Sequence, residues 1–410
     1  MLSIRESAEN ILTAAIAGVQ PDAAVRRALA DGAFCSRVHL VAIGKAAWQM
    51  ANTAYQVLGR AITDGIVITK YHHSQGAIGS LRIFEAGHPI PDAQSFAATR
   101  AAMTLVQGLG AEDQVLFLVS GGGSALFESP RIDPQELADI TAQLLACGAD
   151  IIEMNTIRKR LSDVKGGRFA ELCRPARVYA VVLSDILGDP LDMIASGPAC
   201  ADRSTCEQAL AIAKKYDLRL SAQARACLAQ ETPKLLTNVQ TKITGSVRAL
   251  CAAAGQAAEA LGYSCTLLTD CLCCEAREAG RFLASVARTH QHTAQPLAFL
   301  AGGETVVHLT GHGLGGRNQE LALAAAEGIA GLSDTAVFSF GSDGTDGPTD
   351  AAGGFVDGQT LARLHRAGLC VSDVLRENDA YHALARTGGL LMTGPTGTNV
   401  NDLAVVLIRR

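Results

Sequence analysis

The chain has 410 residues, of which 48% are hydrophobic, and its formal net charge at pH 7 is −5. This length predicts two or three domains, and the apolar fraction is sufficient for substantial cores. No long basic run occurs, which argues against a nucleic-acid partner, and no apolar run reaches the ~18 residues of a membrane span. Residues 1–7 lack an apolar core, so we expect no signal peptide.

Cysteine usage favours a reduced, cytoplasmic protein. The chain has 12 cysteines, several of them in apolar helical stretches. Cys271, Cys273 and Cys274 cluster, but nothing nearby completes a zinc-finger spacing. We therefore interpret the cysteines as core thiols.

The first elements alternate between helix and strand, as in α/β proteins. Sequence patterns predict helices over 3–19, from 21 and over 46–58, and strands over 38–43, 66–68 and 81–84. Lys45 follows the strand over 38–43, at the carboxyl edge of a parallel sheet where ligands collect, although a surface lysine after a turn has the same pattern. Asp92 is expected to cap the next helix, and we interpret His88 as a turn histidine held by backbone hydrogen bonds rather than as a catalytic group.

A glycine-rich loop follows the next strand. Ser120, Gly121, Gly122, Gly123 and Ser124 come after five apolar residues that are typical of a strand buried on both faces. Without Cβ atoms, successive backbone N–H groups can turn toward one anion, and a helix that starts at the loop also favours negative charge. The loop therefore indicates a phosphate site, and the alternative is a tight turn that requires positive φ.

A basic segment, residues 154–168, follows a helix predicted over 133–147. It carries five basic residues and is interrupted by two glycines. It is either a solvated helix face or a cationic wall for a carboxylate or phosphate. If the segment is such a cationic wall, Arg160 and Lys165 are the strongest candidates for binding the carboxylate or phosphate.

Two carboxylates follow the apolar strand predicted over 178–183. Asp185 comes directly after the strand end, and Asp189 lies in a Gly-Asp-Pro turn. Strand-end carboxylates of this kind hold Mg²⁺ or accept a hydroxyl proton in α/β folds.

Residues 233–241 are polar without periodicity, so we place a domain boundary there and predict domains 1–238 and 239–410. In the second domain, patterns predict helices over 247–261, 275–289 and 317–330, and strands over 265–268, 296–300, 305–309, 335–340 and 403–408. His290 and His292 flank a glutamine in what we interpret as a solvated linker rather than a metal site.

Three carboxylates, Asp343, Asp346 and Asp350, are separated by glycines after the strand over 335–340. Their spacing resembles a cation loop but not the EF-hand order, so it does not imply Ca²⁺. A set of Asx turns is the alternative.

Gly311, Gly313 and Gly316 satisfy G-x-G-x-x-G between a predicted strand and a helix, which taken alone suggests a dehydrogenase. The expected acidic residue does not follow at the end of the next strand. Arg317 comes directly after the third glycine, where a cation serves a phosphate better than a ribose.

Phosphoryl transfer accounts for more of these residues. Its transition state requires backbone N–H groups, cations, metal-bound carboxylates and a group that orients the attacking oxygen. The chain has no G-x-x-x-x-G-K-[ST] sequence and no protein-kinase motif set, so neither common kinase class applies.

The order of these motifs resembles the class II glycerate kinases of the MOFRL group, some members of which carry hydroxypyruvate reductase names. The resemblance spans nearly the whole chain. It rests on Gly44-Lys45, Gly87-His88-Pro89, Ser120–Ser124, Asn155–Gly167, Ser184–Pro190, Gly315–Glu320 and Gly341–Asp350.

The resemblance implies two α/β domains, an N-terminal Rossmann-like domain with a mostly parallel sheet and a smaller C-terminal one, with the active site in the cleft between them. It implies ATP- and Mg²⁺-dependent phosphorylation of D-glycerate, usually at the 2-hydroxyl, with Lys45 and Arg317 as the leading catalytic cations. We count Asn318 and Glu320, which share the Arg317 motif, among the substrate- and phosphate-binding residues.

Several alternatives stay open at this stage. An NAD(P)H-dependent hydroxypyruvate reductase is the alternative enzyme, and a non-catalytic binding protein is a third class. The sequence does not decide between the 2- and 3-hydroxyl, which glycine loop holds ATP, which carboxylate is base or metal ligand, or whether the chain forms a homodimer.

Overall fold

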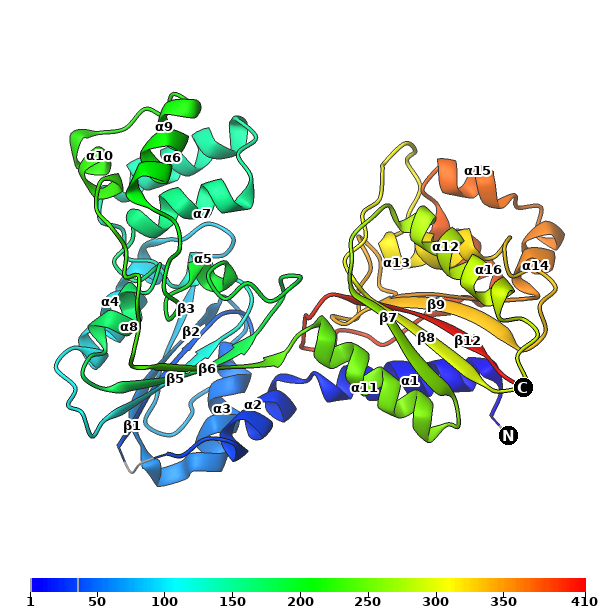
Figure 1. Cartoon of the computed structure of the whole chain (residues 1–410), viewed down its shortest axis with the longest axis horizontal. Helices are drawn as coiled ribbons and strands as arrows, with labels where there is room; N and C mark the ends of the chain where they lie inside the picture. Colours follow the sequence, from blue (N-terminus) through cyan, green and yellow to red (C-terminus); the bar gives the residue numbers. More distant parts are fainter. Residues whose placement is uncertain (1, 35–36) are drawn as a thin grey trace. The chain divides into compact units, whose positions relative to one another are not determined.

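The computed structural model describes residues 2–34 and 37–410, and the chain divides into two compact units. The N-terminal unit comprises Ala24–Ser184 and Asp189–Thr244 (Figure 1). The C-terminal unit comprises Met1–Ala23, Asp185–Gly188 and Gly245–Arg410.

This division differs from the predicted one. The predicted boundary at residue 238 lies before Thr244, and Met1–Ala23 belong to the C-terminal unit instead of the first domain. The cause is the apolar face of the first helix, whose Ile11 and Ala15 are buried with residues of the second half of the chain.

The N-terminal unit is built on a six-stranded sheet in the order β3-β2-β1-β4-β5-β6. Neighbouring strands from β3 to β5 are parallel. This order is that of a doubly wound α/β sheet, and the chain reverses its direction of growth between β1 and β4. The strands are β1 (Val38–Ile43), β2 (Ile62–Lys70), β3 (Arg82–Ala86), β4 (Gln114–Val119), β5 (Arg177–Leu183) and β6 (Val239–Gly245).

Both faces of this sheet are covered, which explains the continuous apolar runs of β1 and β4. One face packs against α2 (Pro21–Ala30) and α3 (Ala47–Leu58) through residues such as Leu40 and Leu116. On the other face Phe117 meets Phe127 and Phe169 in an aromatic cluster. The helices on this face are α4 (Ala93–Val106), α5 (Gly123–Leu126) and α8 (Arg168–Leu172).

Four further helices of the N-terminal unit form a separate apolar cluster of their own (Figure 1). They are α6 (Pro134–Ala146), α7 (Ile151–Arg160), α9 (Cys206–Lys215) and α10 (Ala222–Leu228). Asp133 and Asp150 accept backbone N–H bonds at the starts of α6 and α7 and so fix where those helices begin. Short 3₁₀ turns, η1 (Gly59–Ala61) and η2 (Ile194–Ser196), complete the unit.

The C-terminal unit contains a second six-stranded sheet, in the order β11-β10-β9-β12-β8-β7. Only the β7–β8 pair is parallel, and the other pairs are antiparallel. The strands are β7 (Ser264–Leu272), β8 (Leu297–Gly303), β9 (Thr335–Gly341), β10 (Gly353–Asp357), β11 (Leu390–Leu391) and β12 (Asp402–Ile408).

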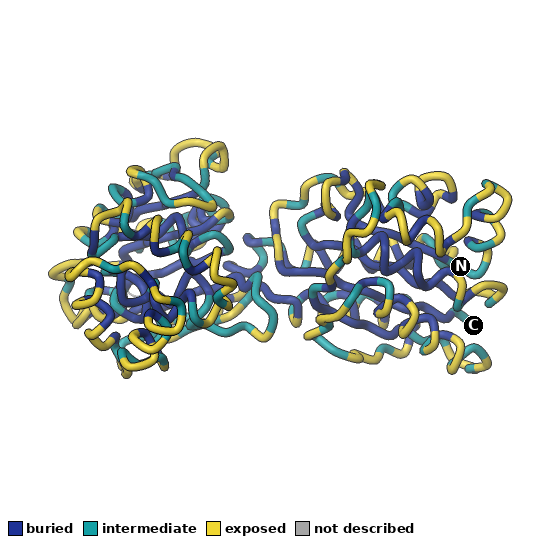
Figure 2. The backbone as a smooth tube through the Cα atoms, turned by 90° about the horizontal axis from the view of Figure 1, so that it is seen from above, coloured by how far each residue is buried: buried dark blue, intermediate teal, exposed yellow. Residues whose placement is uncertain are grey.

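The central strand β12 shows how this unit is layered. Leu403, Val405 and Leu407 pack with one core, and the intervening Ala404 and Val406 pack with the other. Figure 2 shows the resulting buried strands beneath more exposed helices and loops. The helices on the first face are α1 (Ile4–Gly18) and α11 (Val247–Ala260). Those on the second are α12 (Ala276–Thr289), α13 (Arg317–Ala325), α14 (Thr360–Arg366), α15 (Val371–Arg376) and α16 (Ala380–Thr387).

The fold class and most of the predicted elements are confirmed, but three are not. The strand predicted over 305–309 is absent apart from one bridge at Val306, and α13 ends at Ala325 rather than near 330. The third difference is the polar stretch over 233–241, where a domain boundary and no element was predicted, but where β6 begins at Val239. A membrane-crossing helix would need more length and apolarity than any helix of the described chain has.

Candidate functional site

The glycine loop predicted as an anion site ends the central strand β4 of the N-terminal unit. Gly122 has φ +86°, and Gly123 begins α5. No hydrogen bond within the described residues uses the backbone N–H groups of Gly121, Gly122, Gly123 or Ser124. Four consecutive donors without a protein acceptor are what a bound anion requires.

The loops after β1 and β4 are joined to each other. The backbone N–H of Lys45 donates to the carbonyl oxygen of Gly121 over 2.9 Å, and that of Ala46 donates to Ser120 Oγ over 3.1 Å. Gly44 allows this approach, because a Cβ there would lie 2.2 Å from Ser120 Oγ. The glycine loop therefore lies at the point where strand order reverses, the usual ligand position in such sheets.

Lys45 and His88 lie beside this loop. Lys45 is exposed, and its ammonium forms no ion pair with any described residue. His88 lies close by, since a Cβ on Gly122 would be 3.0 Å from its Cδ2. Partial burial, followed by the charges of Lys45 and Lys70, lowers the pKa of His88. Its neutral form is therefore favoured near neutral pH, while Lys45 supplies the charge.

His88 does not behave as the sequence predicted. Its ring lies next to Gly122, and within the described residues it forms no hydrogen bond to the backbone. His88 therefore lies at the edge of the glycine loop, which its sequence position alone did not indicate.

The Ser124 end of the loop contacts two further polar side chains, which are linked by hydrogen bonds. Ser124 Oγ lies 3.0 Å from Ser196 Oγ, which donates to Asn155 Oδ1 over 2.9 Å. Ala195 and Ser196 have φ of +50° and +60°, and a Cβ on Gly123 would lie 2.7 Å from the Ala195 side chain. The segment that contains η2 is thus closely fitted against α5.

Arg160 and Lys165 do not present a cationic wall to solvent. Both side chains are fully buried. Arg160 pairs with Glu231 at 3.2 Å and with Asp202, and Lys165 pairs with Glu128 at 2.5 Å. Burial lowers the pKa of Lys165 to about 8, although Glu128 opposes this change. These geometries favour a structural role for both residues.

The two carboxylates at the end of β5 are placed differently from each other. Asp185 belongs to the C-terminal unit, and its backbone oxygen accepts a hydrogen bond from Asn401 Nδ2 over 3.3 Å. Asp189 belongs to the N-terminal unit, is partly exposed and has φ +52°. A positive φ is uncommon for aspartate and indicates that the turn is constrained.

Arg317, the second predicted cation, begins α13 in the C-terminal unit and is held by two carboxylates. It forms a two-pronged pair with Asp402, with Nη2 2.9 Å from Oδ1, and its Nη1 lies 3.1 Å from Glu304. Burial alone would lower the pKa of Arg317, but the hydrogen bonds and charge of Asp402 hold it above its ordinary value. The guanidinium is therefore charged and fixed in orientation.

Asn318 and Glu320 have their polar groups engaged in the described structure. Asn318 Oδ1 accepts from Ser339 Oγ over 2.6 Å, and its Nδ2 donates to Asp346. Glu320 pairs with Arg277 at 3.0 Å and accepts from Asn378 Nδ2 over 3.1 Å. Both residues support the first turn of α13, which positions Arg317.

The predicted metal residues Asp343, Asp346 and Asp350 do not fit a shared ion. Asp343 accepts from the N–H of Thr345, and Asp350 accepts from the hydroxyl of Tyr381. Asp346 is buried and accepts the N–H groups of the first turn of α13, at 2.8 Å from the nitrogen of Gln319. Within residues 2–34 and 37–410, these three carboxylates do not come together as a group of candidate ligands. An Asx turn at Asp343, helix capping by Asp346 and the tyrosine contact of Asp350 explain these carboxylates better than a magnesium site.

The G-x-G-x-x-G loop is not arranged to bind a dinucleotide. The N–H of Gly311 donates to Asn378 Oδ1 over 2.9 Å, and that of Gly313 donates to the carbonyl oxygen of Glu377 over 2.8 Å. A Cβ on Gly316 would lie 2.3 Å from Asp346 Cγ. The loop thus packs against its own unit, and these backbone donors are used there rather than left for a pyrophosphate.

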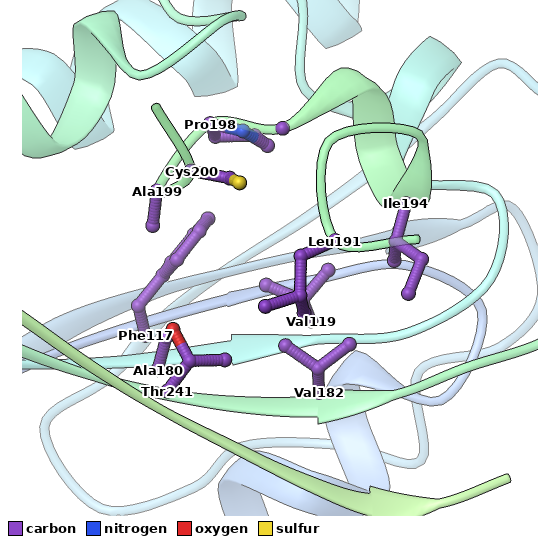
Figure 3. A pocket seen from close by; sticks show the side chains of 11 residues that line it. Phe117, Val119, Ala180, Val182, Leu191, Ile194, Pro198, Ala199, Cys200 and Thr241 are labelled. Atoms are coloured by element: carbon purple, nitrogen blue, oxygen red, sulfur yellow. The ribbon is translucent and has the colours of Figure 1, made fainter. Parts of the chain in front are cut away.

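A cavity of about 20 Å³ lies in the N-terminal unit between the sheet and the segment that follows Asp189 (Figure 3). Its lining includes Phe117, Val182, Leu191 and Ile194. This volume suits one water molecule and is far too small for a nucleotide base. We interpret the cavity as a packing defect under the segment and not as a ligand site.

Sequence reasoning missed three residues of these arrangements. Glu304 and Asp402 hold Arg317 from 13 and 85 residues away, respectively, and no local pattern links them. Arg158 lies in the basic segment but was not singled out, although its Nη2 contacts the Ser124 carbonyl oxygen at 3.4 Å. Helical periodicity on α7 was the available signal, because Arg158 and Arg160 point to different sides of one helix.

Comparison with known proteins gives independent evidence about the family of this chain. Residues 7–229 match the model of a domain of unknown function, DUF4147, and residues 297–402 match the MOFRL family. A D-glycerate 2-kinase of Thermotoga maritima is 50% identical, with 99% of each chain covered. A glycerate 2-kinase of Pyrococcus horikoshii is 38% identical over 91% of this chain and 87% of the relative.

A protein of Agrobacterium vitis with a provisional hydroxypyruvate reductase name is 38% identical, with 99% of this chain and 95% of the relative covered. Among solved structures, a crystal structure of glycerate kinase from Thermotoga maritima has a TM-score of 0.94 at 50% identity and covers 98% of this chain and 99% of that one. The first family model spans more than half of the chain, and the relatives match nearly all of it. The chain therefore belongs to the glycerate 2-kinase family whose C-terminal part is the MOFRL domain.

Proposed function

We propose that this protein phosphorylates D-glycerate with ATP at the 2-hydroxyl and releases 2-phosphoglycerate and ADP. The observation that carries the proposal is the Ser120–Ser124 loop. Among residues 2–34 and 37–410, four of its N–H groups meet no acceptor, and the neighbouring ammonium of Lys45 forms no ion pair. The name of the 50% identical Thermotoga maritima relative supports the choice of substrate and product.

In the proposed reaction, the 2-hydroxyl oxygen of glycerate attacks the γ-phosphorus of ATP in line. The bond from that phosphorus to the β–γ bridging oxygen breaks, and ADP leaves with the electron pair. The substrate hydroxyl proton passes to a carboxylate, for which Asp185 and Asp189 are the candidates. The loop N–H groups and Lys45 bind negative oxygens and so stabilise the charge that spreads over the transferring group. We retain Arg317 as a second candidate catalytic cation.

Magnesium has no assigned ligands in this proposal. The predicted carboxylates are used as turn and helix caps, so no step is routed through a metal held by them. ATP itself is expected to bring a magnesium ion in solution, as phosphoryl-transfer substrates generally do.

The proposal is tested by measuring ADP formation from ATP as a function of D-glycerate concentration. A parallel sample with hydroxypyruvate and NADH, without ATP, tests the reductase alternative. Saturable ADP formation that depends on D-glycerate supports the kinase. NADH oxidation by hydroxypyruvate, with ATP left intact in the first sample, would replace it with the reductase.

A further inference from the structure

Arg158 occupies an unusual position on α7. Its side chain is half-buried, and its Nη2 donates to the carbonyl oxygen of Ser124 at 3.4 Å, near the upper limit for a hydrogen bond. It forms no ion pair with another residue of the described chain. A weak contact to a neutral oxygen leaves most of the donor capacity of a guanidinium unused.

The other two basic residues in the last turn of α7 are fully committed. Lys159 lies 3.2 Å from both Asp192 and Asp202, and Arg160 pairs with Asp202 and Glu231. Only Arg158 is directed toward the end of the glycine loop, through its contact with Ser124. The last turn of α7 therefore carries two structural cations and one, Arg158, that has no carboxylate partner in the described part of the chain.

One buried carboxylate, Glu128, lies behind the loop. Glu128 is paired with Lys165 at 2.5 Å, and its other oxygen, Oε1, is buried without a hydrogen-bond partner. The charge of Glu128 also acts on Arg158, and Arg158 acts on Lys165. Glu128 is thus paired with Lys165, and within the described residues Arg158 has no ion-pair partner of its own beside the four N–H groups of the loop.

We infer that Arg158 and the Ser124 end of the glycine loop form the subsite for the carboxylate of a small hydroxy acid. This inference rests on the proposed function and adds the group that distinguishes an acid from a neutral polyol. A guanidinium binds a carboxylate through two parallel hydrogen bonds, which a neutral amide or alcohol cannot reproduce. Arg160 and Lys165, the residues expected from sequence, are replaced in this role by Arg158.

The position of the subsite agrees with the rest of the loop. Lys45 adjoins the Gly122 side, with its Cγ 3.3 Å from where a Gly122 Cβ would lie, and Arg158 contacts Ser124. One end of the loop then serves the carboxylate, and the other serves the hydroxyl that receives the phosphoryl group. The carboxylate and the 2-hydroxyl are on adjacent carbons in glycerate, and Gly122 and Ser124 are only two residues apart in the loop.

The test compares D-glycerate with the neutral amide of D-glyceric acid as substrates of wild type and Arg158→Gln. We expect kcat/KM for D-glycerate to fall 10- to 100-fold, through KM, as loss of a charge-assisted pair implies. The KM for ATP and the kcat/KM for the amide stay unchanged. The acid-to-amide ratio, which is kcat/KM for D-glycerate divided by kcat/KM for the amide, therefore falls by the same factor. Arg158→Lys retains the charge and recovers part of the ratio.

Two control variants separate this role from a structural one. Arg160→Gln removes the buried cation two residues further on and should lower thermal stability without altering the acid-to-amide ratio. Arg60→Gln removes an exposed arginine of η1 and should alter neither quantity. An equal decline of acid and amide in Arg158→Gln, with the ratio preserved, would overturn the subsite.

Calorimetry with D-glycerate in the absence of ATP makes this test independent of turnover. Binding by wild type that is lost in Arg158→Gln supports the subsite even if no phosphorylation occurs, which would refute only the proposed function. Equal binding by the two proteins, or no binding by wild type at millimolar D-glycerate, would refute the subsite.

Discussion

The backbone N–H of Lys45 donates a hydrogen bond to the carbonyl oxygen of Gly121 over 2.9 Å, and this bond links the loops that follow β1 and β4. The N–H groups of Gly122, Gly123 and Ser124, which follow, meet no acceptor within the described residues. The same bond fixes the backbone from which the Lys45 side chain extends. This one hydrogen bond therefore positions both the Lys45 side chain and the glycine loop, at the point where the strand order of the sheet reverses.

The first prediction concerns Lys45. Lys45→Met removes an exposed ammonium, so we expect an unchanged melting temperature and a fall in kcat of about 100-fold or more, as for loss of one transition-state donor. The measurement is steady-state ADP formation with D-glycerate. Lys214→Met, an exposed lysine on α9, is the control and should retain full activity. Wild-type turnover by Lys45→Met would exclude this residue from the chemistry.

The second prediction concerns the shape of the glycine loop. Gly122 has φ +86°, and a Cβ there would lie 3.0 Å from the His88 ring, so Gly122→Ala should distort the loop and abolish most activity. Gly148→Ala is a matched control, because Gly148 has φ +70° with open space around it. Both variants should lose about 1–2 kcal/mol of stability from backbone strain. Equal activities of the two would argue against the loop as a binding site.

The third prediction concerns the carboxylates that hold Arg317. Arg317→Ala should lose most of kcat while remaining folded, and Asp402→Asn should lose a smaller part because Glu304 still contacts the guanidinium. Steady-state kinetics of each variant, with kcat and the KM values for ATP and D-glycerate determined separately, measure these losses. Asp357→Asn, which breaks the pair with Arg363 in the same unit, should not change kcat. An Asp402→Asn enzyme with normal kcat would show that this contact serves only folding.

The fourth prediction concerns pH and the stability of the C-terminal unit. Burial raises the pKa of Asp346 to about 6, against an ordinary value of 3.8, although the N–H groups of Gln319 and Asn318 oppose the rise. Between pH 4 and 6 the folded state then binds more protons than the unfolded state, so its stability falls as pH rises through this window. The decline should be on the order of 2–3 kcal/mol, at about 1.4 kcal/mol per pKa unit.

Urea unfolding at a series of pH values measures this decline. Asp346→Asn is less stable overall because it loses acceptors for the α13 amides, but it should lack this component of the slope between pH 4 and 6. Identical slopes for wild type and variant would show that Asp346 does not titrate in this range.

The fifth prediction concerns the buried pair of Lys165 and Glu128. Lys165→Met leaves a carboxylate buried and uncompensated, so we expect a loss of about 3–5 kcal/mol in the free energy of unfolding. The double variant Lys165→Met with Glu128→Leu should recover much of this loss. Chemical denaturation of these two variants and of Glu128→Leu alone gives the coupling free energy of the pair. A stable Lys165→Met protein with impaired D-glycerate binding would restore Lys165 to a substrate role.

Local signals predicted much of the fold. Ser3 and Asp92 cap α1 and α4 as expected, and the bounds of β1 match the apolar run that predicts it. These features depend on side chains a few residues apart, which a sequence displays directly. The position of α1 was not predictable in the same way, because its apolar face reveals that it packs but not which half of the chain it contacts.

The site was predicted less well, for a related reason. A sequence shows that Arg160 and Lys165 are basic, but not that Asp202 and Glu128 neutralise them in the interior. It equally does not show that Asp346 turns its carboxylate to the amides of α13 instead of to a cation. Whether a charge is used for structure or for ligands is decided by long-range pairing, and that appears only in the fold.

The measurement that tests the central claim most directly is ³¹P NMR of the protein with ATP, magnesium chloride and D-glycerate. We predict loss of the γ-phosphate signal, appearance of ADP and a new phosphomonoester signal that matches authentic 2-phosphoglycerate. A signal that matches 3-phosphoglycerate would contradict the assigned hydroxyl, and ATP that stays intact would contradict the kinase itself.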